Sequence, residues 1–193
     1  MCETRAHGSN VFATVKLPAD IVCRIHTLFR FFSFFDSLFI SQRKMSESLI
    51  FLMGKYEARF PTDRLYVRSH MWFYAEAGAY RVGFTAFAVR MLQDVYFLDW
   101  GVEPGAVVKA RQEIGEVESS KAVSSLHAPS DGRLLQFNRE LMKDPTAINV
   151  DNYGKGWLFD FEPQDAVLLS AAEYVSHLEG IWEDTQRQIK GQI

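Results

Sequence analysis

The chain has 193 residues, of which 48% are hydrophobic, enough to bury the core of one globular domain. Its formal net charge of -3 provides no basic surface for a phosphate backbone, which argues against nucleic acid as a partner. The two cysteines, Cys2 and Cys23, both lie near the N-terminus. No disulfide framework is therefore expected to stabilise the rest of the chain, which fits a reducing compartment.

Residues 1–44 have no clear hydrophobic period. We expect them to be an N-terminal extension, either a leader or a misassigned start with translation beginning at Met45. The apolar run TLFRFFSFFDSLFI is interrupted by Arg30 and Asp36 and is too short to span a bilayer. A mitochondrial transit peptide is nearly free of acids, unlike this segment. These observations predict a cytoplasmic protein without membrane contact, with the mitochondrial matrix as the alternative.

Short strands are the main prediction after residue 63. Aromatic and β-branched residues alternate with glycine, proline and polar turn residues, a pattern typical of small barrels and sandwiches. The bend from Glu76 to Ala79 separates two aromatic runs and predicts a β-hairpin, and a Pro-Ser-Asp-Gly turn at 129–132 separates two further strands. Strands are predicted over residues 64–67, 71–85, 94–100, 112–118, 124–129, 132–137 and 157–163.

Three helices are predicted beside these strands. Thr85 is expected to cap a short helix, and Asn138 is expected to cap a second one that Pro145 ends. The tail over residues 164–189 has apolar residues at three- and four-residue spacing, so it is predicted to be an amphipathic helix. Its apolar face would hold Leu168, Ala172, Val175, Leu178 and Trp182. The fold class expected is therefore mainly β with accessory helices.

Lys121 is the candidate functional residue. It lies in a serine-rich bend between two predicted strands, and its neighbours are Glu118, Ser119, Ser120 and Ala122. A bend of small residues presents one long side chain to the solvent, where a modifying enzyme could reach a free amine. The alternative is an ordinary surface lysine, since lysines belong on surfaces. The bend alone does not separate the two readings.

The stretch around Lys121 resembles the lipoyl-lysine hairpin of the glycine cleavage H-protein family, whose pattern is Glu-Ser-x-Lys-Ala followed by a Pro and a Gly. The resemblance continues in order from about Arg64 to about Tyr174. It departs from the family where Gln93 replaces a glycine, Trp100-Gly101 a Leu-Pro, Met71 a glutamate and Ser120 an apolar residue. We expect these departures near surfaces that partner enzymes touch. The matching residues are Glu118, Ser119, Lys121, Ala122, Pro129 and Gly132 in the hairpin, His70, Trp72, Gly83–Ala88, Leu92 and Asp94 before it, and Asn138–Pro145, Tyr153, Gly154, Gly156 and Trp157 after it.

The resemblance implies a lipoyl-domain-like barrel-sandwich hybrid with a C-terminal helix. It also implies the domain organisation: an extension over 1–44, an N-terminal segment over 45–63, a lipoyl carrier domain over 64–174 and a helical tail over 175–193. The family's protein is a carrier and not an enzyme, so no catalytic residue is expected. Lipoate would be joined to Lys121 as N6-lipoyllysine, with Glu118, Ser119, Ser120 and Ala122 flanking the attachment site.

The partners implied are those of glycine cleavage. The arm would take the aminomethyl group of glycine from glycine decarboxylase, a pyridoxal-phosphate enzyme, to the aminomethyltransferase. Dihydrolipoyl dehydrogenase would reoxidise the arm, lipoate-attaching enzymes would load it, and the carrier itself would be a monomer. Tethering replaces diffusion by a high effective concentration, and the cofactor supplies the chemistry.

Other functions fit the sequence less well or remain open. A lipoyl donor that relays the group to other lipoate-dependent enzymes would use the same hairpin, and an unmodified adaptor homologue stays open because Gln93 and Trp100 are altered. Biotin carriers prefer methionine on both sides of the lysine, unlike Ser120 and Ala122. Lipoyl modules of 2-oxo acid dehydrogenases favour Asp before the lysine and come joined to a catalytic domain.

The histidines predict no metal site, because none shows paired ligand spacing or a cysteine partner. His70 is expected to be a structural strand residue. His127 follows Lys121 in the next strand, where it could line the surface on which the arm rests, although we expect it to be a partly buried structural residue. The Gly-Lys-Gly at residues 154–156 lacks the strand–helix context of a phosphate loop and is predicted to be a turn.

Overall fold

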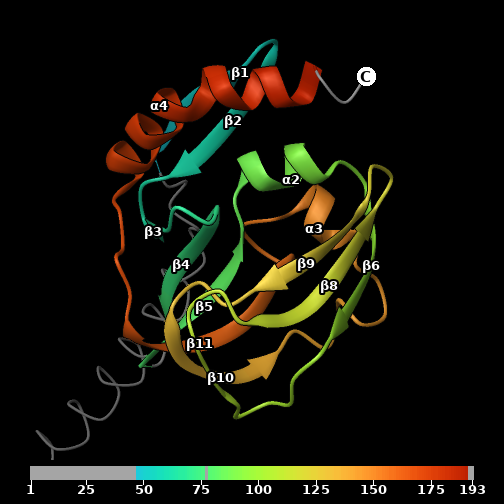
Figure 1. Cartoon of the computed structure of the whole chain (residues 1–193). Helices are drawn as coiled ribbons and strands as arrows, with labels where there is room; N and C mark the ends of the chain where they lie inside the picture. The colour runs from blue at the N-terminus through green and yellow to red at the C-terminus, as the bar shows by residue number, and fades with distance from the viewer. Residues whose placement is uncertain (1–46, 77, 191–193) are drawn as a thin grey trace, which may run out of the picture. The chain divides into compact units, whose positions relative to one another are not determined.

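The structure is a computed structural model that describes residues 47–76 and 78–190, with side chains described as far as Arg187. The predicted extension over 1–44, with Cys2 and Cys23, lies outside these residues. Antiparallel strands are the commonest regular structure in the described chain, and the helices lie beside them (Figure 1). The predicted mainly β fold with accessory helices is confirmed.

The largest sheet has six strands in the order β3-β4-β5-β11-β10-β7. The β4–β5 hairpin bends where the sequence predicts it, and Gly78 at the bend has a φ of 87°, which glycine adopts without steric cost. Residues 101–112, which follow the strand predicted over 94–100, contain one short strand, β7. The strands are β3 (Leu65–Tyr66), β4 (Met71–Glu76), β5 (Ala79–Phe84), β7 (Val107–Val108), β10 (Asp131–Phe137) and β11 (Trp157–Asp165).

A second sheet of three strands, in the order β6-β8-β9, carries the candidate lysine. Its strands are β6 (Val95–Trp100), β8 (Glu113–Ser119) and β9 (Val123–His127). Apolar side chains of both sheets form the first hydrophobic core, so the two sheets make a sandwich (Figure 1). The fully buried members include Phe73, Val82, Ile114, Leu134, Leu158, Phe159 and Phe161.

An N-terminal hairpin and the C-terminal helix form a second core outside this sandwich. The hairpin consists of β1 (Ser48–Met53) and β2 (Tyr56–Pro61), which the sequence analysis did not predict, and the helix is α4 (Ala171–Lys190). Figure 1 shows α4 lying along this hairpin, with α2 (Ala86–Leu92) next to both. Their shared core includes Phe51, Ala58, Phe60, Tyr66, Phe87, Tyr174 and Leu178.

The tail helix is confirmed, but it begins at Ala171 and not at residue 164, because β11 continues to Asp165 and Leu169 pairs with Tyr66. Leu168 therefore lies outside the helix.

The buried face of the helix also differs from the prediction. Leu178 is buried and Val175 and Trp182 are half-buried, as expected, whereas Ala172 is exposed. Tyr174 is fully buried because its ring stacks on Tyr66 at a centroid distance of 4.9 Å. The helix runs without a break across the domain boundary expected after residue 174.

The helix predicted over residues 138–144 is wrong. These residues form successive turns, and the four-residue helix α3 (Ala147–Val150) begins only after Pro145. The Asn138 side chain donates to the backbone carbonyls of Lys155 and Trp157 at 2.9 and 2.7 Å. These buried hydrogen bonds attach residues 138–144 to the start of β11. The segment is also too short to form a stable helix on its own.

Within the described part of the chain, no helix is both long enough and apolar enough to cross a membrane.

Candidate functional site

The turn that carries Lys121 is built around the hydroxyl of Ser119. This oxygen donates to the carbonyl of Ala122 at 3.1 Å and lies 3.3 Å from the backbone N–H groups of Lys121 and Ala122, which donate to it. The backbone N–H of Ser119 also donates to the Ala122 carbonyl, at 3.1 Å. Ser119 is 5% exposed, so water cannot replace these bonds and the turn has one defined shape.

Lys121 itself is exposed at the tip of the β8–β9 hairpin, together with Ser120, Ala122 and Val123. Glu118, the nearest acid before it, is half-buried at the end of β8. Within residues 47–76 and 78–187, the Lys121 ammonium makes no hydrogen bond and no ion pair. The predicted geometry of a long, unpaired side chain on a bend of small residues is therefore present.

The hairpin tip is fastened to the rest of the sandwich at the start of β6. The backbone N–H of Ser120 donates to the carbonyl of Asp94 at 3.0 Å. One residue further, Val95 exchanges two hydrogen bonds with the side chain of Asn149 in α3, at 3.0 and 2.8 Å. The amide of Asn149 thus pairs with the start of β6, to which the lysine turn is bonded through Ser120.

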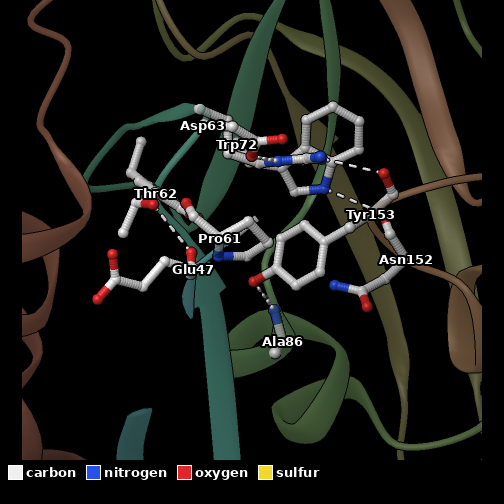
Figure 2. A network of polar contacts seen from close by, with 10 residues as sticks. Glu47, Pro61, Thr62, Asp63, Trp72, Ala86, Asn152 and Tyr153 are labelled. Carbon is white, nitrogen blue, oxygen red and sulfur yellow. Dashed lines mark hydrogen bonds and ion pairs between the residues drawn. The ribbon is translucent and has the colours of Figure 1, made fainter. Parts of the chain in front are cut away.

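Helix α2, which lies next to the lysine hairpin, is fixed by its first backbone groups. As predicted, the hydroxyl of Thr85 caps it and accepts from the N–H of Ala88 at 3.2 Å. The N–H of Ala86 donates to the hydroxyl of Tyr153 at 3.0 Å, and the indole of Trp72 donates to the carbonyl of Asn152 beside it, also at 3.0 Å (Figure 2). The first bond connects α2, and the second connects β4, to the loop between α3 and β11.

Two pockets lie on either side of α2 and both border the β8–β9 hairpin. The first, which we call the Trp182 pocket, has a volume of about 290 Å³. The second, the His127 pocket, has a volume of about 260 Å³. The Trp182 pocket is lined by Met53, Gly54, Arg90, Met91, Gln93, Lys121, Trp182 and Gln186. The His127 pocket is lined by Ser69, His70, Met71, Phe84, Ala88, Met91, Leu92, Val117 and Ser124 to His127.

His70 makes structural contacts, but it lies in the bend before β4 and not in a strand as predicted. Its Nδ1 lies 2.8 Å from the hydroxyl of Tyr174, which in turn lies 3.1 Å from the hydroxyl of Thr85. Burial lowers the pKa of His70 to about 4, and the charge of His177 adds to the effect. Burial likewise raises the pKa of the Tyr174 phenol, so this network stays neutral at physiological pH.

The residues at which the chain departs from the family pattern fall in different environments. Ser120 is exposed beside Lys121, and Gln93 lies in the Trp182 pocket. Trp100 stacks on Phe137 with ring centroids 4.1 Å apart. Met71 is only 3% exposed, so for this residue the expected surface position is wrong.

No cluster of histidine, cysteine, aspartate or glutamate suited to a metal ion occurs among the residues that the structure describes. His127 is exposed rather than partly buried, and it lines the pocket named after it. The Tyr153–Gly156 segment forms the turn that was predicted.

Sequence reasoning found the lysine turn but not the walls beside it. Met53 and Trp182 come from opposite ends of the described chain, and no local pattern connects them with Lys121. The local sign of the Trp182 pocket in the sequence was the glutamine at position 93, where the family has glycine. Its φ of 66° and ψ of -148° lie in a region that is essentially reserved for glycine.

Comparisons with known proteins agree with this architecture. The family model described as glycine cleavage H-protein matches residues 64–181. The chain is 38% identical over 122 residues to the glycine cleavage system H protein of Thermobifida fusca, covering 62% of this chain and 96% of that protein. It is 42% identical over 118 residues to the one from Bordetella pertussis, covering 59% of this chain and 94% of that protein.

A solved structure supports the fold. The crystal structure of a glycine cleavage system H protein from Mycobacterium marinum superimposes with a TM-score of 0.54 at 40% identity, covering 61% of this chain and 97% of that one. The expected lipoyl-domain-like barrel-sandwich fold with a C-terminal helix is confirmed. Since the family model also matches more than half of the sequence, the chain belongs to the glycine cleavage H-protein family.

Proposed function

We propose that the protein is a non-catalytic lipoyl carrier of the glycine cleavage system and that Lys121 is the attachment site. The observation that carries the proposal is the exposed, unpaired Lys121 on a turn whose shape depends on the buried Ser119 hydroxyl. An enzyme that acylates this amine meets no bulky neighbour, because Ser120 and Ala122 flank it. The residues present therefore fit a covalently attached lipoyl group.

The chain's own contribution is presentation. When attached, lipoate supplies a disulfide that can accept the aminomethyl group of glycine at the decarboxylase and release it at the aminomethyltransferase. The β8–β9 hairpin holds the lysine away from the core, and the hydrogen bond from the Ser120 N–H to the Asp94 carbonyl fixes the position of the turn. A rigid base with a long tether gives each partner a high local concentration of the reactive end.

Intact-mass measurement of the protein from its native cell tests the attachment. The expected result is one lipoyl increment that is lost in Lys121→Arg and kept in Lys155→Arg, which changes another exposed lysine. The same increment in both variants would place the lipoyl group elsewhere. No increment in the wild-type protein would contradict the carrier function and would favour the unmodified adaptor homologue.

Reconstitution separates glycine cleavage from a relay of lipoyl groups to other enzymes. The lipoylated chain is mixed with glycine decarboxylase, and exchange of bicarbonate into glycine is followed. Exchange that depends on Lys121 supports the carrier of glycine cleavage, whereas a lipoylated chain without exchange points to the relay. The partners beyond the decarboxylase, the cytoplasmic location and the monomeric state stay predictions.

A further inference from the structure

A third pocket, which we call the Arg68 pocket, lies between the bend before β4 and the first turns of α4. Its volume is about 520 Å³, and it is lined by Arg68, Leu169, Ala172, Glu173, Ser176 and His177. Neither Lys121 nor any residue of α2 or of the β8–β9 hairpin lines it. A ligand of this pocket is therefore independent of the proposed lipoylation.

The backbone on both sides of the Arg68 pocket is fixed by hydrogen bonds. Tyr66 and Leu169 exchange two backbone bonds of 2.8 Å, which join β3 to the segment that enters α4. The N–H of His70 donates to the carbonyl of Val67 at 3.0 Å and closes the bend that carries Arg68. The two walls of the pocket therefore have a defined spacing.

Two basic side chains share this pocket without a partner. Burial is the main cause that lowers the pKa of His177, and the nearby charge of Arg68 adds to it. Within residues 47–76 and 78–187, the Arg68 guanidinium makes no hydrogen bond and no ion pair, and the His177 imidazole makes no hydrogen bond. The guanidinium, one ring N–H and the hydroxyl of Ser176 are thus available as donors. An anion with several oxygens can accept from all of them.

Glu173 is the one carboxylate among the described residues that line the pocket. Its Oε2 accepts from the hydroxyl and the N–H of Ser170 at 2.7 and 2.8 Å, and these bonds lower the pKa of the carboxyl. The side chain is therefore fixed at the start of α4 and ionised at neutral pH. No residue of the described chain donates to its Oε1. This oxygen can accept a hydrogen bond but repels a ligand oxygen that has no proton.

This combination of groups selects among oxyanions. The ligand has to accept from Arg68 and His177 and, through another oxygen, donate to Glu173. Hydrogenphosphate does both, because it keeps one proton at neutral pH and its other oxygens match the donor fork of a guanidinium. Sulfate, ionised carboxylates and the dianions of phosphate monoesters have no proton to donate.

We propose that the Arg68 pocket is a binding site for inorganic hydrogenphosphate, in which Arg68 and His177 donate to the anion and Glu173 accepts its proton in a hydrogen bond. The affinity is modest, because Arg68, Glu173 and Ser176 are exposed and ion pairs in contact with water are weak. A dissociation constant on the order of 1 mM corresponds to such contacts.

The histidine ring signals in a ¹H–¹⁵N spectrum of the full chain test this site. Potassium phosphate is added at neutral pH and at an ionic strength held constant with potassium chloride, since salt screens exposed charges. The His177 signal, which His177→Gln identifies, is expected to shift with a dissociation constant on the order of 1 mM. A His177 signal that phosphate moves no further than chloride does would overturn the proposal.

Sulfate and glycerol phosphate, added in the same way, test the choice of anion. Both are expected to bind at least about fivefold more weakly than phosphate, which is the worth of one hydrogen bond. Equal affinity for sulfate and phosphate contradicts the proposal. Tighter binding of glycerol phosphate would assign the pocket to a phosphate monoester instead of free phosphate, and would likewise contradict it.

Arg68→Gln is expected to weaken phosphate binding at least about tenfold, because it removes the charge-assisted bonds. Arg139→Gln changes an exposed arginine outside the pocket and is the matched control, which should leave the dissociation constant unchanged. Equal weakening by both would mean that overall charge attracts phosphate, and the site would be refuted. Lys121→Arg should bind phosphate as the wild type does, so a failure of the proposed lipoylation does not alter this result.

Glu173→Gln tests the selection by the carboxylate. Glutamine at this third helical position still accepts from Ser170, so α4 should keep its start, which far-ultraviolet circular dichroism checks. Its amide also donates, so sulfate should then bind about as tightly as phosphate. A preference for phosphate that survives this substitution contradicts the role of Glu173 and, with it, the proposal.

Discussion

At Ser119, one hydroxyl both donates to the Ala122 carbonyl and accepts from the backbone beneath Lys121. Ser119→Ala leaves these buried groups without that partner, so the free energy of unfolding is expected to fall by about 1–2 kcal/mol. Lipoate attachment should also slow, because the turn loses its defined shape. Urea denaturation and the time course of the mass increment measure the two effects.

Ser120→Ala is the control for this prediction, since Ser120 is the exposed neighbour and its hydroxyl makes no bond within the described residues. It should change neither stability nor attachment by a measurable amount. Equal effects of the two substitutions would mean that the attaching enzyme reads the serines directly and that the turn geometry is secondary.

His70 makes stability depend on pH in a defined direction. Its pKa is about 4 in the folded protein and about 6.5 when unfolded, so between these values the unfolded chain binds the extra proton. Stability is therefore expected to fall as the pH drops from about 6.5 to 4, by on the order of 3 kcal/mol in total. Urea denaturation at successive pH values measures this slope.

His70→Asn removes the titration and suits the backbone, because His70 has a φ of 64° and asparagine tolerates that conformation. The slope should then be largely lost, whatever the stability at neutral pH. His177→Gln is the comparison. Burial and Arg68 lower the pKa of His177 in the same direction, but this residue is more exposed, so most of the slope should survive its removal.

Among the elements, α4 contains one position that weakens it. Gly180 lies inside the helix, is exposed, and has nothing within 4 Å of the place where a Cβ would stand. Gly180→Ala should therefore raise the free energy of unfolding by about 0.5–1 kcal/mol. Thermal denaturation measures the gain, with Glu179→Ala as a neighbour that should stay nearly neutral. A loss of stability would show that α4 needs glycine there for another reason.

The elements predicted from sequence are those that local chemistry determines. The β4–β5 hairpin follows from its aromatic runs and from a glycine at the bend, and α2 follows from Thr85, whose hydroxyl bonds three residues along. The segment after Asn138 is not a helix although the Asn138 oxygen accepts from the N–H of Glu140 as a cap would, because the side-chain amide nitrogen is bonded to the carbonyls of residues 155 and 157. Only the folded chain brings those carbonyls to it.

The N-terminal hairpin was not anticipated because residues 49–53 are continuously apolar, so no period distinguishes a strand from a helix. Only the part of the site that lies within one short stretch of sequence could be predicted. Lys121 and Ser119 lie within one turn, and a motif reveals them. Met53 and Trp182 reach the same place only through tertiary packing, which no spacing in the sequence records.

On the scale of the whole molecule, the described chain has two hydrophobic cores that meet at α2. Phe60 is buried in the second core, with its ring 5.8 Å from that of Tyr66 and 5.2 Å from that of Tyr174. Phe60→Ala should lower the free energy of unfolding by about 3–5 kcal/mol.

The loss should appear in a single transition, because the hydroxyl of Tyr174 in the second core contacts His70 and Thr85 beside the first. Far-ultraviolet circular dichroism and tryptophan fluorescence during urea denaturation test this coupling. Two separate transitions would show that the cores unfold independently. Ile50→Ala, on the exposed face of the same hairpin, should change stability by no more than about 0.5 kcal/mol.

The order in which the chain is synthesised gives the Trp182 pocket a further meaning. The ribosome releases the β1–β2 hairpin first and the β8–β9 turn with Lys121 next, whereas the indole of Trp182 arrives only with α4. A nascent or truncated chain that lacks α4 would therefore present Lys121 without the Trp182 wall of this pocket. The pocket is thus complete only in a chain that has been made as far as the end of α4.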